Sequence, residues 1–304
     1  MLASEAPPAK TTTLTMTPIA SLRHTTRYSY SVPVDLGPHV VRLRPTPYCR
    51  TLILDYAISA SPTDHFVNWL QDPNGNWMAR YVFTQPTDTL LIEVQLSVDL
   101  TPVNPFDFFV REDAATWPFS YDADLRLELG AYTAGGSADA FAAAFASELG
   151  RGPTNTVEVL TSLNRRVHEA VGYEIREEPG VQEPEHTLAR GTGSCRDSAW
   201  LLVQALRQLG FGARFVSGYL IQAPDIVAGP TGVASELHAW AEAYLPGAGW
   251  IGLDPTLGVL CSEGHIPLAA CAHHHSAAPV AGSHSEASVA MHHEITLEFT
   301  PAEG

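Results

Sequence analysis

A cysteine stands where the sequence predicts the start of a helix. Residues 191–200 read GTGSCRDSAW, and apolar residues follow at helical spacing at Leu202, Ala205, Leu206 and Leu209. Ser194 is a natural N-cap residue with Asp197 three positions on, so we expect the helix to begin at Cys195. The free N–H groups and the positive end of the helix dipole favour a thiolate there. The same N–H groups can hold an oxyanion.

A histidine and an aspartate further along could complete this chemistry. Residues 236–244 alternate as a strand, PGAG makes a turn, and residues 250–254 form the return strand before a proline. If Tyr244 pairs with Trp250, His238 and Asp254 share one side of the sheet. Diagonal neighbours on one face are about 7–8 Å apart, a gap that an imidazole and a carboxylate can bridge. A register slip of one residue would break this arrangement.

Each of these three residues also has an ordinary interpretation. Cys195 could fill the core, His238 could bond to backbone or water, and Asp254 could be a strand-end turn residue. The order of helix-start cysteine, strand histidine and strand-end aspartate favours catalysis by Cys195 as nucleophile, His238 as base and then acid, and Asp254 as the group that orients the ring. The candidates for a second oxyanion donor are Tyr173 and Gln182.

The elements that must position these residues are preceded by one β-rich block, a connection and a helical block. Short runs of β-branched and aromatic residues fill residues 20–100, and Asn74-Gly75 between two of them predicts a hairpin because both residues tolerate positive φ. Residues 101–135 are rich in proline and aromatics, and we expect an ordered connection there. Helices are predicted over 137–149 and from Asn155 to about 171, followed by a polar loop over 176–193.

Composition narrows the function classes. The 304-residue chain has a formal net charge of -16, so generic binding to a phosphate backbone is not expected. No stretch is apolar enough to span a membrane, and the N-terminus has no secretory h-region. The four cysteines form no CxxC pair, which argues against a disulfide framework. We therefore predict a cytoplasmic protein that binds neither nucleic acid nor membrane.

The motifs together resemble the bacterial transglutaminase-like superfamily of papain-type thiol enzymes. The matching runs are GSCRD at 193–197, ARFVSGYL at 213–220, HAWAE at 238–242 and GWIGLDPT at 249–256. HTTRYSY at 24–30, RLRP at 42–45 and the Asn74-Gly75-Asn76 hairpin are similar to the β-domain that precedes this core in bacterial members. The resemblance covers roughly residues 20–270 and implies a Cys-His-Asp triad at Cys195, His238 and Asp254.

The resemblance implies an α+β fold, an antiparallel β-domain followed by a papain-like core in which the helix-start cysteine packs on an antiparallel sheet. The predicted divisions are a disordered tail (1–18), the β-domain (19–110), a connection (111–135), the catalytic core (136–270) and a histidine-rich segment with a final strand (271–304).

Two features depart from the family pattern. Ser198 stands where bacterial members usually carry an aromatic residue. The run ACAHHH at 270–275 replaces a Gly-Arg-Asp-Tyr-like run, and seven of the thirteen histidines lie between His265 and His293. Neighbouring histidines in an extended strand point to opposite faces, and the spacing is no standard zinc pattern. We therefore assign no metal site and no cofactor, and leave metal binding by this segment open.

The predicted function is cleavage or exchange of a peptide or protein amide through a thioester on Cys195. Water as acceptor would make a peptidase or amidase, and an amine would make a transglutaminase; the triad does not distinguish them. The alternative is a non-catalytic binding or scaffold protein on the same fold. Substrate identity, oligomeric state and the role of the β-domain stay open.

Overall fold

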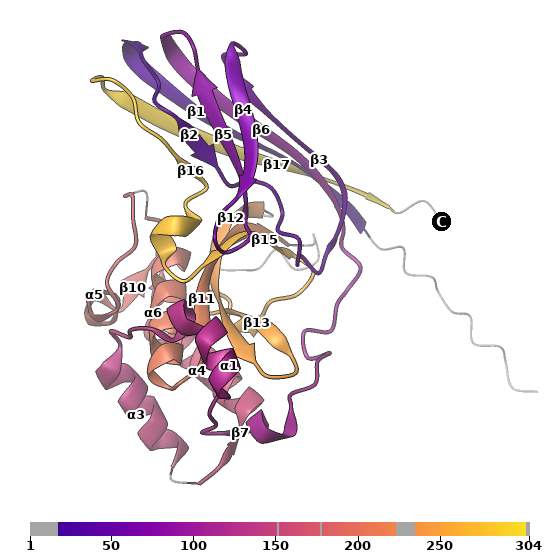
Figure 1. The fold of residues 1–304 in the computed structure, drawn as a ribbon, viewed down its shortest axis with the longest axis vertical. Coiled ribbons are helices and arrows are strands. Elements are labelled where there is room, and N and C mark those ends of the chain that lie inside the picture. The colour runs from indigo at the N-terminus through magenta and orange to yellow at the C-terminus, as the bar shows by residue number, and fades with distance from the viewer. Residues whose placement is uncertain (1–17, 151, 177, 223–234, 302–304) are drawn as a thin grey trace, which may run out of the picture.

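The computed structural model describes residues 18–301, apart from residues 151, 177 and 223–234. Residues 1–17 of the predicted tail therefore lie outside the described part. The chain is α+β with antiparallel sheets, as predicted: an N-terminal β-domain lies above a mixed core in Figure 1. No helix in the described ranges is long and apolar enough to cross a membrane.

The N-terminal domain consists of two four-stranded sheets, ordered β17-β1-β6-β3 and β16-β2-β5-β4. Its buried residues alternate along the strands, most regularly in β6, because one face of each sheet closes on the domain core. The strands contributed by the first hundred residues are β1 (Pro18–Val34), β2 (His39–Val41), β3 (Leu52–Ser61), β4 (His65–Gln71), β5 (Trp77–Phe83) and β6 (Thr87–Asp99).

The predicted hairpin joins β4 to β5, with one difference in its turn. Only Gly75 has a positive φ, of 80°, and Asn74 does not. Asp72 also stabilises the turn, because its carboxylate accepts hydrogen bonds from the backbone N–H groups of Asn74 and Asn76.

The C-terminal segment returns to this domain. β17 (Val289–Pro301) pairs antiparallel with β1 along its whole length, and β16 (Val280–Ala281) pairs with β2. The final strand was predicted over 288–299, but nothing in its sequence indicated its partner. Each sheet of the domain is thus completed by a strand from the far end of the chain (Figure 1).

The core is built on a five-stranded antiparallel sheet ordered β14-β13-β12-β11-β15. Every residue of the inner strand β11 is buried, because both faces of the sheet are covered. Helices cover one face, and Tyr219, Ile221, Ile266 and Leu268 join the hydrophobic core of the β-domain on the other. The strands are β11 (Ala213–Ile221), β12 (Ser235–Leu245), β13 (Gly249–Asp254), β14 (Val259–Leu260) and β15 (His265–Cys271).

The helices agree with the sequence analysis except in the predicted polar loop over 176–193. That segment contains a seven-residue helix, α5 (Pro184–Arg190), which starts with a proline at its first position and ends at Gly191 in the left-handed conformation. The predicted connection holds short elements: η1 (Glu112–Ala114), β7 (Thr116–Trp117), α1 (Ala123–Glu128) and α2 (Gly130–Thr133). The others are α3 (Asp139–Leu149), β8 (Thr154–Asn155), α4 (Thr156–Ala170), β9 (Gly172–Tyr173), β10 (Thr192–Gly193), α6 (Cys195–Gln208) and η3 (His274–Ala277).

Candidate active site

Helix α6 begins at Cys195, as predicted, and its start is fixed by Asp197. The Asp197 carboxylate accepts hydrogen bonds from the backbone N–H of Ser194, at 2.9 Å, and from the Ser194 hydroxyl, at 2.8 Å. Ser194 is the N-cap, so these bonds close the first turn around the cysteine. The thiol is half-buried at the positive end of a 14-residue helix.

Asp197 also ties the preceding loop to this helix start. Arg176 donates two hydrogen bonds of 3.0 Å to the two carboxylate oxygens, and the Gln182 backbone N–H donates a third. Burial alone would raise the pKa of Asp197, but the hydrogen bonds from Arg176, Gln182 and Ser194 outweigh it, and the pKa lies below its ordinary value. Asp197 is thus a buried, fully bonded carboxylate two residues from Cys195.

The strand register that the chemistry required is present. Tyr244 pairs with Trp250 in the β12–β13 hairpin, which settles the register that the sequence left open. His238 Nε2 then lies 2.9 Å from Asp254 Oδ2, and both side chains are fully buried. Asp254 ends β13 and is followed by a proline, which stops the strand where the carboxylate is needed.

Four donors hold the Asp254 carboxylate. His238 and His265 donate to Oδ2, and the backbone N–H groups of Thr256 and Leu257 donate to Oδ1. Burial would raise the pKa of Asp254, but the charge of His238 and the hydrogen bonds from both histidines hold it far below its ordinary value. Asp254 is therefore ionised whenever the protein is folded near neutral pH.

The other nitrogen of His238 is left without a hydrogen-bond partner. Nε2 is engaged by Asp254, and Nδ1 makes no hydrogen bond to any described residue although it is buried. Burial lowers the pKa of His238, but the charge of Asp254 and then of the Cys195 thiolate outweigh it, so the pKa lies well above its ordinary value. The charge of Cys195 therefore acts on His238 together with that of Asp254.

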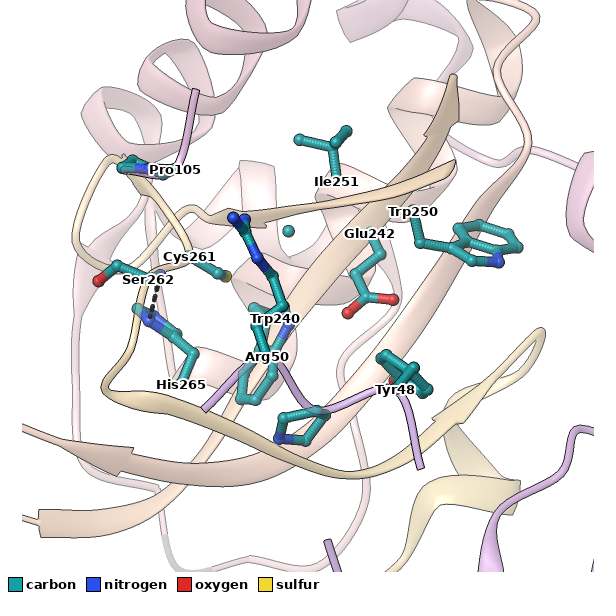
Figure 2. Close-up of a pocket in the computed structure, with 12 residues that line it drawn as sticks. Tyr48, Arg50, Pro105, Trp240, Glu242, Trp250, Ile251, Cys261, Ser262 and His265 are labelled. Atoms are coloured by element: carbon teal, nitrogen blue, oxygen red, sulfur yellow. Dashed lines mark hydrogen bonds between the residues drawn. The ribbon is translucent and has the colours of Figure 1, made fainter. Parts of the chain in front are cut away.

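His265 is a member of this cluster that the sequence analysis did not select. Its Nδ1 accepts a hydrogen bond from the Ser262 backbone N–H, drawn dashed in Figure 2, so its Nε2 carries the proton and donates to Asp254 at 3.1 Å. The sequence placed His265 only among the tail histidines. Its position in the run HIPLA, which matches the family, was the one available signal.

Two further groups surround the thiol. Tyr173 is near enough to Cys195 and Glu236 that burial, followed by those two charges, raises the pKa of its phenol to about 12. The Glu236 carboxylate lies 3.5 Å from His238 Nδ1 with its side chain 21% exposed. Gln182 makes structural hydrogen bonds instead. Its side-chain oxygen accepts a hydrogen bond from the Thr187 hydroxyl, and its backbone N–H donates one to Asp197.

A small cavity lies beside this cluster rather than over the thiol. It measures about 60 Å³, and His265 is the cluster member that lines it, with Tyr48, Trp240, Glu242 and Cys261 among the other walls (Figure 2). That volume holds only a few water molecules and no peptide. The cavity is therefore packing space behind His265 and not a substrate cleft.

The remaining cysteines sit in environments that suppress reactivity. Burial raises the pKa of Cys49 to about 11 and that of Cys271 to about 12. Burial, followed by the charges of Asp254 and Glu242, raises the pKa of Cys261 well above its ordinary value. In the described part of the chain, only one group of three or more possible metal ligands was found, at His273–His275, and it does not include Cys195.

Comparison with family models identifies both parts of the chain. Residues 20–99 match the bacterial transglutaminase-like N-terminal region, and residues 143–255 match the transglutaminase-like superfamily core. The second match spans the Cys195, His238 and Asp254 positions.

Full-length and partial relatives occur in mycobacteria. An uncharacterized protein of Mycobacterium tuberculosis is 26% identical over 296 residues, covering 92% of each chain. An uncharacterized protein of Mycobacterium leprae is 38% identical over 93 residues, which is 31% of this chain and 32% of the relative. A crystal structure of a candidate cysteine protease from Cytophaga hutchinsonii has a TM-score of 0.68 at 20% identity, over 94% of this chain and 93% of that one, and so shares its fold.

Proposed function

This chain is a member of the transglutaminase-like superfamily with the bacterial N-terminal region, and from that premise we propose that it is a thiol enzyme acting on amide bonds. The observation that carries the proposal is the buried His238–Asp254 pair at 2.9 Å, next to a cysteine in the first turn of α6. Nucleophile, base and orienting group are the three parts that acyl transfer by a cysteine requires.

The reaction follows from these positions. Cys195 Sγ attacks the amide carbonyl carbon, and the resulting oxyanion lies near the free N–H groups at the start of α6. His238, which holds the thiol proton on Nδ1, passes that proton to the departing nitrogen as the C–N bond breaks. The product is a thioester on Cys195, and water or an amine then resolves it with His238 acting as base.

The raised pKa of His238 supports the placement of this proton on the imidazole. A histidine with its ordinary pKa would be mostly neutral at pH 7, whereas Asp254 keeps His238 protonated when Cys195 is a thiolate. His238 is therefore expected to hold its proton through neutral pH.

The test is a short pulse of iodoacetamide across pH 4–9, with peptide mapping of the alkylated protein. We expect Cys195 alone to label quickly, at a rate that persists at pH 6, while the buried Cys49, Cys261 and Cys271 label slowly because their pKa values are raised. Labelling of Cys195 no faster than the others would overturn the nucleophile assignment and favour the scaffold alternative.

A second experiment measures amide cleavage by variants of the proposed catalytic residues. Cys195→Ala should abolish amide cleavage with the fold intact by circular dichroism. Asp254→Asn should lower kcat on the order of 10⁴-fold, the loss seen when the aspartate of a serine triad is neutralised. Wild-type turnover in either variant would remove that residue from the mechanism. Product analysis with and without added amines then distinguishes a peptidase or amidase from a transglutaminase.

A further inference from the structure

Three consecutive histidines form a cluster that the proposed reaction does not use. The ligand nitrogens of His273, His274 and His275 all lie within 4.8 Å of one another. The sequence argument against a metal here assumed an extended strand, in which neighbours point apart. The structure has a 3-10 helical turn instead, η3, which begins at His274 and brings the three rings onto one side.

The middle ring of the cluster is largely buried against aromatic side chains. His274 is 8% exposed and packs against Trp200 at 4.8 Å and Phe215 at 6.2 Å between ring centroids. Among the described residues its ring nitrogens have no hydrogen-bond partner, so both are available to a ligand. A ligand bound at this ring would supply the missing partner.

The flanking rings are free to adjust around that partner. His273 and His275 are exposed, and the only ring hydrogen bond of the triplet is a long one of 3.5 Å from the His275 backbone N–H to His273 Nδ1. Nitrogens bound to one tetrahedral zinc, each at 2.0–2.1 Å, lie about 3.4 Å apart. A shift of roughly 1 Å by the two exposed rings therefore converts the cluster into a three-imidazole site.

The charges around the cluster act in both directions. The charge of Glu183 acts on His273 and that of Asp197 acts on His274, and both favour a cation. Arg207 opposes it, but its guanidinium is committed to the carbonyl oxygens of Ala213 and Ala272. Three neutral imidazoles with open remaining positions suit zinc, nickel or copper.

We propose that His273, His274 and His275 form a binding site for one divalent transition-metal ion of the zinc class, with water in the remaining coordination positions. The site stands on Trp200 of α6, five residues along the helix from Cys195, and is separate from the proposed catalytic cluster. It does not depend on the proposed enzymatic function.

The test is titration of the full, untagged chain with Zn²⁺ in competition with a chromophoric chelator. The chain carries Cys195→Ala throughout, so that zinc bound by the thiolate and His238 is not counted. We expect one ion per chain, and His273→Ala/His275→Ala should weaken its affinity by at least about 100-fold, more than the loss of an outer-shell partner costs. Both substituted residues are exposed, so the fold should be kept.

The matched control is His292→Ala/His293→Ala, which removes another exposed pair of adjacent histidines, from β17. Unchanged affinity in this control, together with loss in the first variant, supports the site. The proposal is overturned if the chain does not bind one zinc ion at a zinc concentration of about 10 micromolar, at which adventitious sites also begin to bind. It is also overturned if both double variants lose affinity equally.

Discussion

At the residue scale, the buried carboxylate of Asp254 organises the candidate site. It accepts from His238 and His265 on one oxygen and from two backbone N–H groups on the other, so its position is determined by three separate segments. The fixed carboxylate in turn sets the tautomer and orientation of His238. His265 does not reach the proposed nucleophile, and we interpret it as a positioning residue.

This role predicts a specific pattern for variants of His265. His265→Ala should lower kcat about tenfold or more with little change in KM, because Asp254 loses a donor. His265→Gln should recover much of the loss, since its amide N–H can take the place of Nε2–H. Steady-state kinetics with a pH profile checks this, and equal losses in both variants would mean that His265 only fills space.

Glu236 predicts a preference among acceptors. Its carboxylate lies 3.5 Å from His238 Nδ1, so a cationic amine approaching the thioester meets a negative charge. In Glu236→Gln, aminolysis by a charged diamine should fall about tenfold, equivalent to about 1.4 kcal/mol, while aminolysis by neutral hydroxylamine changes little. Partition of products between the two amines measures the effect. Equal changes for both would assign Glu236 to general positioning.

At the element scale, the start of α6 depends on a buried network rather than on its N-cap alone. The Asp197 carboxylate accepts hydrogen bonds from Ser194, Arg176 and the Gln182 backbone. The start of α6, the residue after β10 and the loop before α5 therefore meet at one carboxylate. The glycine at 193 fits this packing, because a Cβ there would contact the Asp197 side chain at 2.9 Å.

Removing this carboxylate should be costly. Asp197→Ala leaves Arg176, whose side chain is 12% exposed, without its partner, and we expect a loss of about 3–5 kcal/mol in the free energy of unfolding. Glu158→Ala is the control, because Glu158 is an exposed acid in the first turn of α4 and should change stability by less than about 0.5 kcal/mol. Urea unfolding measures both, and similar small losses would show that the network is not stabilising.

At the scale of the whole molecule, the β-domain and the core share one interface built on β11. His24 of β1 lies in it, 1% exposed, with Nδ1 bonded to the Tyr219 hydroxyl and Nε2 to the Thr26 hydroxyl. A second contact is Arg214 of β11, which stacks on Tyr48 and Trp250 and forms a buried ion pair with Glu242. These polar contacts fix how the domains meet.

The interface should make stability depend on pH. Burial, followed by the charge of His293, lowers the pKa of His24 to about 4, from about 6.5 in the unfolded chain. The neutral form is favoured on folding, so stability is full above pH 6.5 and is lost as pH falls toward 4, by up to about 3 kcal/mol.

Urea unfolding at pH 7.5 and pH 4.5 measures this loss. His24→Gln should be less stable at pH 7.5 but should lose less stability on acidification than wild type. Parallel losses in the two proteins would show that His24 does not carry the effect.

The features that the sequence alone predicted are those decided by neighbouring residues. The start of α6 follows from Ser194 and Asp197 three positions apart, and the proline and glycines after Leu245 indicated the β12–β13 hairpin but not its register. Only the structure decided that register: Leu245 pairs with Gly249 and Tyr244 with Trp250, which brings His238 to Asp254. The matching motifs indicated the α+β fold. The short helix α5 was missed because its seven residues carry too little periodicity to detect.

The tertiary structure alone decided the contacts between distant segments. The pairing of β17 with β1, the bond from His265 to Asp254 and the bond from His24 to Tyr219 join residues that no local pattern relates. The physical reason is that such partners are selected by which faces must be buried together and which polar groups must then be satisfied. Those requirements exist only once the sheets have packed, and the packing of His273 and His274 on Trp200 belongs to the same class.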